Sequence, residues 1–282
     1  MIRKILITAS FLAVTACNMN NSNSGFTPTP TAESAGITSV ATPAPVGSPT
    51  PAASPTPVVS TPSKGTPSLA GALGINDSVD LRAYDGPIVS QFGGTCSTFG
   101  TAAAMDNKLH QKGINKLVSE RDLWAKYGVY DMDAAIAAAS SNYVTEEQYW
   151  PISNVSAPDT LYKTHESLKI TQSIAHEYNM NAALQGLSQG HPLVMAIQVP
   201  NSLGNCDANI DPNSSAGRGQ HVMEAVGYKL DDSISGGGYF ILKNSWGTGC
   251  GDKGYHYFPF SLCSRSDLYC YFTEIVDVED RS

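Results

Sequence analysis

The chain has 282 residues, with 17 Lys and Arg against 25 Asp and Glu, and therefore carries a formal net charge of -8 at pH 7. Binding to nucleic acid needs a basic face, so this balance disfavours a nucleic-acid partner. Ten of the 17 prolines lie in residues 28–67, which indicates a compositionally biased segment. The part that follows, residues 75–282, is long enough for one domain made of two packed lobes.

The first segment, residues 1–17, has the layout of a secretory signal peptide. Two basic residues precede an apolar run over 5–14 that is too short to cross a bilayer as a helix. Residues 14–17 (VTAC) resemble the bacterial lipobox, in which signal cleavage leaves a lipid-carrying cysteine at the new N-terminus. We therefore expect a lipoprotein anchored to a membrane through Cys17, in the bacterial cell envelope and exposed to the periplasm or the cell surface. An ordinary secretory signal with an incidental cysteine is the alternative.

Residues 18–74 consist mostly of Ser, Thr, Pro, Ala and Gly, with Phe26 as the one aromatic residue and only two charged side chains. Such a segment has almost nothing to bury, so we expect it to stay disordered and to act as a tether. About forty of its residues in polyproline geometry, at about 3.1 Å each, would reach on the order of 100 Å. An inhibitory propeptide is the alternative, but it would show helical periodicity and charge, and neither is present.

Predicted helices come first in residues 75–282, and predicted strands come second. Apolar spacing predicts helices over 97–109, 119–124, 131–139 and 181–187. Alternating apolar runs bounded by glycine-rich turns predict strands over 193–199, 221–228, 239–244, 255–258 and 271–276. This order favours an α+β fold of two lobes.

Cys96 stands more than a hundred residues before the other cysteines of the second half. It follows a glycine-rich turn and leads into the predicted helix 97–109, where the positive end of the helix dipole favours a thiolate. Cys96 is therefore a candidate nucleophile, provided that a base lies beside it. A small buried side chain is the alternative.

His221 differs from the other five histidines because it opens an apolar predicted strand, and the next strand ends at Asn244. An asparagine amide can accept the imidazole N–H and so fix the tautomer and orientation of the ring. Because the amide is neutral, the ring remains able to become an imidazolium opposite a thiolate. This pattern predicts a Cys-His-Asn site.

Three segments together resemble the papain-like (cathepsin-type) cysteine peptidases, over about residues 75–282. Residues 239–247 (YFILKNSWG), with the glycines that follow, are similar to the asparagine motif of the family at almost every place. Gln91 with residues 93–96 (GGTC) resembles the nucleophile motif, and residues 220–228 (QHVMEAVGY) resemble the histidine motif. Cysteine, histidine and asparagine also follow one another in the order of the family.

The resemblance implies a papain-like two-lobed fold, with a helical N-terminal lobe and an antiparallel β-barrel-like C-terminal lobe around an active-site cleft. It implies that Cys96 is the nucleophile, His221 the general base and acid, and Asn244 the residue that orients the imidazole. Gln91 would donate to the oxyanion beside the backbone N–H of Cys96, and Trp246 would cover the His-Asn hydrogen bond.

Some positions depart from the pattern of the family. Ser97 and Cys250 stand where the family usually has Trp, and Gln91 lies one place closer to the nucleophile than its counterpart does. The paired glycines of the main specificity pocket are not evident near residues 128–130, so substrate preference is not carried over.

Four cysteines remain, and they can form two disulfides in an oxidising envelope compartment with three possible connectivities. We expect Cys206 to pair with Cys250 and Cys263 to pair with Cys270. A metal site is the alternative, but no pair has the Cys-x2-Cys spacing and no histidine is arranged to help. We therefore expect no metal and no cofactor.

The leading hypothesis is an envelope-anchored, monomeric cysteine endopeptidase that hydrolyses protein or peptide substrates through a thioester acyl-enzyme. A cell-wall amidase or transpeptidase uses the same chemistry, but the Asn-Ser-Trp-Gly segment favours a peptidase. A catalytically silent binding module that keeps the fold is the third hypothesis. The presence of Cys96, His221 and Asn244 together argues against it.

Overall fold

The computed structural model describes residues 68–128 and 131–282. The predicted signal peptide, Cys17 and nearly all of the predicted tether lie outside the described residues, as do residues 129–130. Within the described part, no helix combines the length and the apolar character that crossing a bilayer requires.

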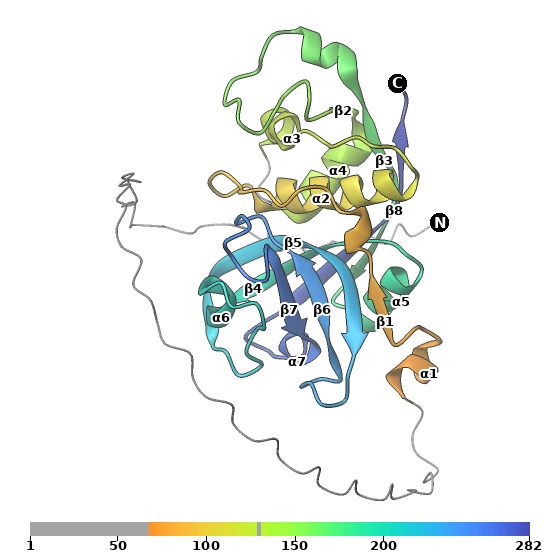
Figure 1. Ribbon diagram of the computed structural model, residues 1–282, viewed down its shortest axis with the longest axis vertical. Coiled ribbons are helices and arrows are strands. Elements are labelled where there is room, and N and C mark those ends of the chain that lie inside the picture. Colours follow the sequence, from red (N-terminus) through yellow and green to blue (C-terminus); the bar gives the residue numbers. More distant parts are fainter. Residues whose placement is uncertain (1–67, 129–130) are drawn as a thin grey trace, which may run out of the picture. The chain divides into compact units, whose positions relative to one another are not determined.

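Three helices form most of the N-terminal lobe, and their bounds differ by at most a few residues from the prediction. They are α2 (Cys96–Gln111), α3 (Glu120–Tyr127) and α4 (Met132–Ser141). Ser119 caps α3 by accepting from the backbone of Asp122, and Asp131 caps α4 in the same way. Figure 1 shows α3 and α4 in the upper part of the molecule, and α2 between them and the sheet.

All strands of the described residues belong to one antiparallel sheet. Its members are β1 (Ser78–Asp80), β2 (Val144–Thr145), β3 (Glu166–Glu177), β4 (Leu193–Pro200), β5 (Ala216–Leu230), β6 (Gly238–Lys243), β7 (Tyr255–Pro259) and β8 (Cys270–Asp280). They are ordered β2-β3-β8-β4-β5-β6-β7, and β1 pairs with β5. The sheet is open, with β2 and β7 at its ends, so the predicted mixed fold is confirmed but the barrel-like lobe does not close.

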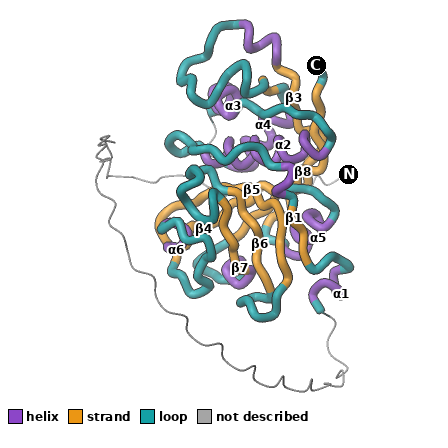
Figure 2. Tube along the Cα trace, in the orientation of Figure 1, coloured by secondary structure: helices purple, strands orange, loops and turns teal. Residues whose placement is uncertain are grey.

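Short helices complete the fold at the ends of strands. They are α5 (Met180–Ser188), α6 (Asn201–Gly204), α7 (Phe260–Cys263) and the 3-10 helices η1 (Arg82–Tyr84) and η2 (Leu161–His165). Figure 2 shows the strands crossing the lower part of the molecule, with β3 and β8 reaching up to the larger helices.

The last residues of the predicted tether form a short helix, so the disorder expected for them is wrong. Helix α1 (Leu69–Leu73) begins at Ser68, whose side chain accepts from the backbone of Gly71, and it ends at Gly74 with φ 65°. Leu69 and Leu73 pack against the core of the sheet. Composition averaged over residues 18–74 does not indicate these two leucines, so the helix was not predicted.

Side chains of the sheet alternate between two apolar clusters. Along β4, Leu193, Met195 and Ile197 face one cluster, which also holds the large buried aromatics of β6, β7 and β8. Val194 and Ala196 face the other cluster, which contains residues of α2 and α4 together with Cys96. Because successive side chains of a strand point to opposite faces, one strand supports both layers. The helix that begins at Cys96 is thereby packed directly onto the sheet.

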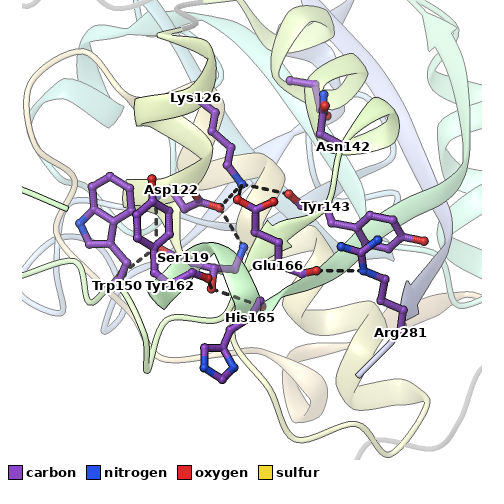
Figure 3. A network of polar contacts seen from close by, with 12 residues as sticks. Ser119, Asp122, Lys126, Asn142, Tyr143, Trp150, Tyr162, His165, Glu166 and Arg281 are labelled. Carbon is purple, nitrogen blue, oxygen red and sulfur yellow. Dashed lines mark hydrogen bonds and ion pairs between the residues drawn. The ribbon is translucent and has the colours of Figure 1, made fainter. Parts of the chain in front are cut away.

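A buried ion pair ties α3 to the strands behind it. Lys126 Nζ lies 2.8 Å from Oδ2 of Asp122 and 2.7 Å from Oε1 of Glu166, and it also donates to the carbonyl of Tyr143 (Figure 3). The same carboxylate oxygen of Asp122 accepts from the backbone N–H of Thr145. One lysine therefore joins a helix, the segment before β2 and the start of β3.

Candidate functional site

Cys96 is the first residue of α2 and is fully buried. The turn before it contains Gly93 with φ 53°, a left-handed conformation that favours glycine. The hydroxyl of Thr95 closes the turn by donating to the carbonyl of Phe92 at 2.7 Å. The predicted placement of Cys96 at the start of a helix is confirmed.

Gly100 brings the first turn of α2 close to β5. A Cβ atom at this position would lie 2.9 Å from Cγ1 of Val222 and 3.4 Å from the backbone of Met223. Val222 directly follows His221 in β5, and Gly100 lies one helical turn after Cys96. A glycine here therefore allows the first turn of the helix, which begins at Cys96, to approach the part of β5 that carries His221.

His221 and Asn244 form the hydrogen bond that the sequence predicts, with 2.8 Å between His221 Nε2 and Asn244 Oδ1. The same amide oxygen accepts from the backbone N–H of Ser245 at 2.7 Å. Because a carbonyl oxygen only accepts, His221 must carry its hydrogen on Nε2. Its Nδ1 is then the ring nitrogen that can take up a proton.

Trp246 lies over the imidazole of His221, with 4.5 Å between the ring centroids and 27° between the ring planes. His221 is 2% exposed and Asn244 is also 2% exposed. Burial lowers the pKa of His221 to about 4, and the nearby His256 lowers it further while Asn244 opposes the shift. The ring is neutral at pH 7 in this environment, and a thiolate beside it would favour the imidazolium.

Gln91 lies next to this pair, although it comes from the loop before α2. Its backbone N–H donates to the carbonyl of Ser245 at 2.7 Å, and the hydroxyl of Ser245 donates to Gln91 Oε1 at 2.7 Å. Gln91 Nε2 donates one hydrogen to the carbonyl of Gly93 at 2.9 Å, which leaves one amide hydrogen. The structure brings Gln91 to the site, and its part in an oxyanion hole remains a prediction.

His256 is a residue of the site that the sequence analysis missed. Its Nε2 lies 3.0 Å from Asn244 Nδ2, and its Nδ1 lies 2.7 Å from the carbonyl oxygen of Asp207. The ring is fully buried. A signal was present, because alternation along β7 turns position 256 inward, where an imidazole needs polar partners.

Both predicted disulfides are confirmed. Cys206 is bonded to Cys250 with 4.8 Å between the Cα atoms, and Cys263 is bonded to Cys270 with 5.0 Å. The first lies beside the site, with Cys250 Sγ 3.8 Å from His256 Nε2. These four cysteines are therefore not metal ligands, and residues 68–128 and 131–282 hold no group of three or more His, Cys, Asp or Glu arranged for a metal ion.

A buried group of acidic side chains lies behind Asn244, between α2, α3 and the sheet. A small cavity there is lined by Asp106 and Glu120 as well as Lys243 and Asn244. Burial raises the pKa of Asp106 to about 7, although Lys243 opposes the shift. Burial likewise raises the pKa of Glu120.

The described arrangement defines a class of protein. A helical lobe packs on an antiparallel sheet, and a cysteine begins the central helix. A histidine of β5 is hydrogen-bonded to the asparagine that directly follows β6, as in papain-like cysteine peptidases. The model of the papain family cysteine proteases matches residues 75–263. The chain belongs to this family.

Curated relatives are similar over the same part of the chain. Thiol protease aleurain of Arabidopsis thaliana is 27% identical over 192 residues, which cover 60% of this chain and 51% of that protein. Chymopapain of Carica papaya is 26% identical over 205 residues, which cover 63% of this chain and 53% of that protein. The chain thus spans about half the length of the curated relatives it matches.

Solved structures share the fold. Xylellain, a cysteine protease from Xylella fastidiosa, aligns with a TM-score of 0.63 and 20% identity, covering 77% of this chain and 90% of that chain. Digestive procathepsin L 3 from the larval midgut of Tenebrio molitor aligns with a TM-score of 0.57 and 22% identity, covering 71% and 69%. At these identities the likeness establishes the papain-like fold.

Proposed function

We propose that the protein is a cysteine endopeptidase that cleaves peptide bonds with Cys96, His221 and Asn244. The observation that carries this proposal is the buried hydrogen bond from His221 to Asn244, beneath Trp246 and beside the strand position against which the Cys96 helix packs. Together with membership of the papain family, it supplies a nucleophile, a proton carrier and an orienting group.

The reaction has two acyl-transfer steps. The thiolate of Cys96 attacks the carbonyl carbon of the substrate, and the carbon–nitrogen bond breaks as the imidazolium of His221 gives the Nδ1 proton to the departing amine. A thioester remains on Cys96. Water then attacks the thioester carbon while His221 Nδ1 takes a proton from it, the carbon–sulfur bond breaks, and the thiolate and imidazolium are restored.

Two N–H groups stabilise the negative oxygen of each tetrahedral intermediate in this proposal. One is the backbone N–H of Cys96 at the start of α2, where the helix dipole also favours negative charge. The other is the second amide hydrogen of Gln91, whose first is used by the carbonyl of Gly93. Asn244 stays neutral and holds the imidazole through both steps.

Labelling of the purified protein, in the presence of a thiol reductant, tests the nucleophile. An epoxysuccinyl peptide should add once to Cys96, and Cys96→Ala should abolish both labelling and casein cleavage without changing the far-ultraviolet circular dichroism. His165→Ala is the control, because His165 ends the 3-10 helix η2 and stacks on Tyr149, so its loss should leave both readouts intact. Full casein cleavage by Cys96→Ala would overturn the proposal.

The same preparation separates the other two hypotheses. Release of soluble fragments from purified peptidoglycan, without cleavage of casein or peptides, would make the protein a cell-wall amidase. Absence of both activities in a protein whose Cys96 is labelled by simple alkylating agents would make it a silent binding module. Neither alternative gains support from a particular contact of the described residues.

We also propose that Cys17 carries lipid and that the segment after it tethers the peptidase domain to an envelope membrane. The lipobox-like residues 14–17 and the Pro-rich composition up to residue 67 support this. Cys17→Ser should move the protein from the membrane fraction to the soluble fraction and remove the acyl mass from its N-terminal peptide. Unchanged fractionation with no acyl mass on wild-type Cys17 would overturn the anchor.

A further inference from the structure

We infer that His256 is a positioning residue that fixes the amide of Asn244 and, through it, the tautomer of His221. This inference deepens the proposed function and rests on it. The three side chains form one chain of hydrogen bonds, from the backbone carbonyl of Asp207 to His256, to Asn244 and to His221. The donor and acceptor of each hydrogen bond determine which group donates in the next one.

The direction is set at the backbone. The carbonyl oxygen of Asp207 can only accept, so Nδ1 of His256, at 2.7 Å, must donate. In a neutral imidazole with its hydrogen on Nδ1, Nε2 is an acceptor. Asn244 therefore has to turn its NH2 group toward His256, at 3.0 Å, and its oxygen toward His221.

The two ends of an asparagine amide are nearly equal in shape, so packing alone selects between them weakly. A flipped amide would place NH2 against Nε2 of His221 and would favour the tautomer with hydrogen on Nδ1. That tautomer could not take up a proton at Nδ1, the atom that serves Cys96 in the proposed reaction. The acceptor on His256 opposes this flip, together with the backbone N–H of Ser245, which donates to Asn244 Oδ1.

The ring of His256 is held in place by the Cys206–Cys250 disulfide loop. Asp207, which supplies the carbonyl, directly follows Cys206, and Cys250 Sγ lies 3.8 Å from His256 Nε2. Gly251 lies close against the ring, because a Cβ atom there would be 2.7 Å from Cε1 of His256. The disulfide loop therefore both confines the ring of His256 and carries the carbonyl that accepts its hydrogen bond.

Charge on His256 is disfavoured, which keeps Nε2 available as an acceptor. Burial lowers the pKa of His256, while the carbonyl and the charge of Asp207 oppose the shift. The other titratable ring nearby, His221, is joined to it through Asn244. At neutral pH the ring thus has the one protonation state in which it can both donate to Asp207 and accept from Asn244.

Two near-isosteric substitutions separate the two bonds of His256. His256→Gln places an amide oxygen near the former Nε2 and can still accept from Asn244. His256→Asn keeps an amide nitrogen near the former Nδ1 and can still donate to Asp207, but it no longer reaches Asn244. We expect His256→Asn to lower kcat by about ten- to a hundredfold with KM unchanged, the scale on which partners of functional histidines act, and His256→Gln to retain most of kcat.

The pH profile and a double variant distinguish positioning from support of the fold. In His256→Asn the alkaline limb of kcat/KM should move to lower pH, because His221 loses the acceptor that stabilises its imidazolium. Adding His256→Asn to Asn244→Ala should cause no further loss, because the effect passes through Asn244. Equal losses in the Gln and Asn variants, an unmoved alkaline limb, or full additivity would each overturn the inference.

A measurement on the wild-type protein tests the inference without depending on the folding of a variant. Nitrogen-15 chemical shifts of the histidine rings should show His256 with hydrogen on Nδ1 and His221 with hydrogen on Nε2, and the opposite tautomer of His256 would overturn the inference. If Cys96→Ala retained activity, the proposed function would fail. If only the His256 predictions failed while Cys96→Ala was inactive, the peptidase would stand without this positioning residue.

Discussion

At the scale of single residues, hydrogen-bond donors and acceptors determine how the side chains of the site are oriented. Asn244 accepts from His221 and from the backbone of Ser245, and it donates to His256, so each hydrogen-bonding end of its side chain has a buried partner. An unpaired buried polar group costs about 1 to 3 kcal/mol. The neutral amide therefore contributes to stability as well as to the orientation of the imidazole.

Trp246 lies over the ring of His221, and we expect its removal to change both the pKa of His221 and the rate. In Trp246→Ala we expect the pKa of His221 to rise from about 4 toward its ordinary value, because burial is the main cause of its depression. Weakening of a hydrogen bond worth about 1 kcal/mol corresponds to about a fivefold lower kcat/KM.

Titration of the His221 ring by NMR and peptide hydrolysis check the two effects of Trp246→Ala. Tyr178→Ala is the control, since Tyr178 is 65% exposed and should leave both unchanged. A pKa of His221 that stays at its wild-type value after loss of the indole would contradict the shielding role.

Asp106 makes stability depend on pH in a direction that is unusual for a carboxyl group. Burial raises its pKa to about 7, so between about pH 4 and pH 7 the folded protein keeps a proton that the unfolded chain releases. The free energy of unfolding should therefore fall as pH rises through this range, by at most about 4 kcal/mol from this group.

Urea unfolding of wild type and Asp106→Asn between pH 4 and pH 8 isolates this contribution. The amide can keep the hydrogen bond that Oδ1 accepts from the backbone of Val118 at 2.8 Å, so the variant should lose the part of the slope that Asp106 contributes and not the contact. Glu120, whose pKa burial also raises, contributes in the same direction in both proteins. His221, whose pKa is lowered, works in the opposite direction in both proteins. Parallel stability curves would show that Asp106 does not hold the proton.

The sequence predicts Cys96, His221 and Asn244 as a set because their motifs are local and lie at the ends of predicted elements. The structure brings their segments together through the packing of Gly100 on β5 and the pairing of β5 with β6. His256 was not predicted: alternation along β7 indicates that it faces inward, but its role depends on the carbonyl of Asp207 49 positions away. No periodicity or motif encodes such a contact.

At the scale of secondary-structure elements, the clearest local signals predict the helices and the central strands well. Caps at Ser119 and Asp131 place the starts of α3 and α4. Strand β3 was missed because most of its second half is exposed, so the apolar alternation that marks a strand is lost there. Its backbone pairing with β8 holds it in the sheet, although its own sequence does not indicate a strand.

Removal of the ion pairs of Lys126 tests how strongly they hold α3, since they join the helix to β3 (Figure 3). Lys126→Met should destabilise the protein by about 3 kcal/mol, because it leaves the fully buried carboxylate of Asp122 without its cation. Adding Asp122→Asn should recover part of the loss, because no unpaired charge then remains buried. Urea unfolding measures both changes.

The control for Lys126→Met is Lys229→Met, which breaks the pair with Asp231 where the lysine side chain is 51% exposed. An exposed pair contributes about 0 to 1 kcal/mol, so this variant should be nearly neutral. Equal losses at the two lysines would show that burial does not govern the contribution of the α3 pair.

At the scale of the whole molecule, the site exists because a helix of one lobe meets a strand of the other. Cys96 begins α2 of the helical lobe, whereas His221 lies in β5 and Asn244 directly follows β6. The two lobes share the apolar cluster on one face of β4, in which residues of α2 and α4 pack against Val194 and Ala196. The distance between Cys96 and His221 therefore depends on how closely α2 and β5 pack.

Gly100→Ala tests this dependence directly. Alanine has the higher helix propensity, by about 1 kcal/mol, but its Cβ would lie 2.9 Å from Cγ1 of Val222. The contact should push α2 away from β5, and kcat/KM should fall by about tenfold or more, because small displacements of reacting groups have large effects on rate. Val222→Ala in the same chain removes the opposing methyl groups and should restore part of the activity. Steady-state hydrolysis and urea unfolding of the single and double variants distinguish the causes: full activity in Gly100→Ala would show that the lobes adjust to one another without separating Cys96 from His221.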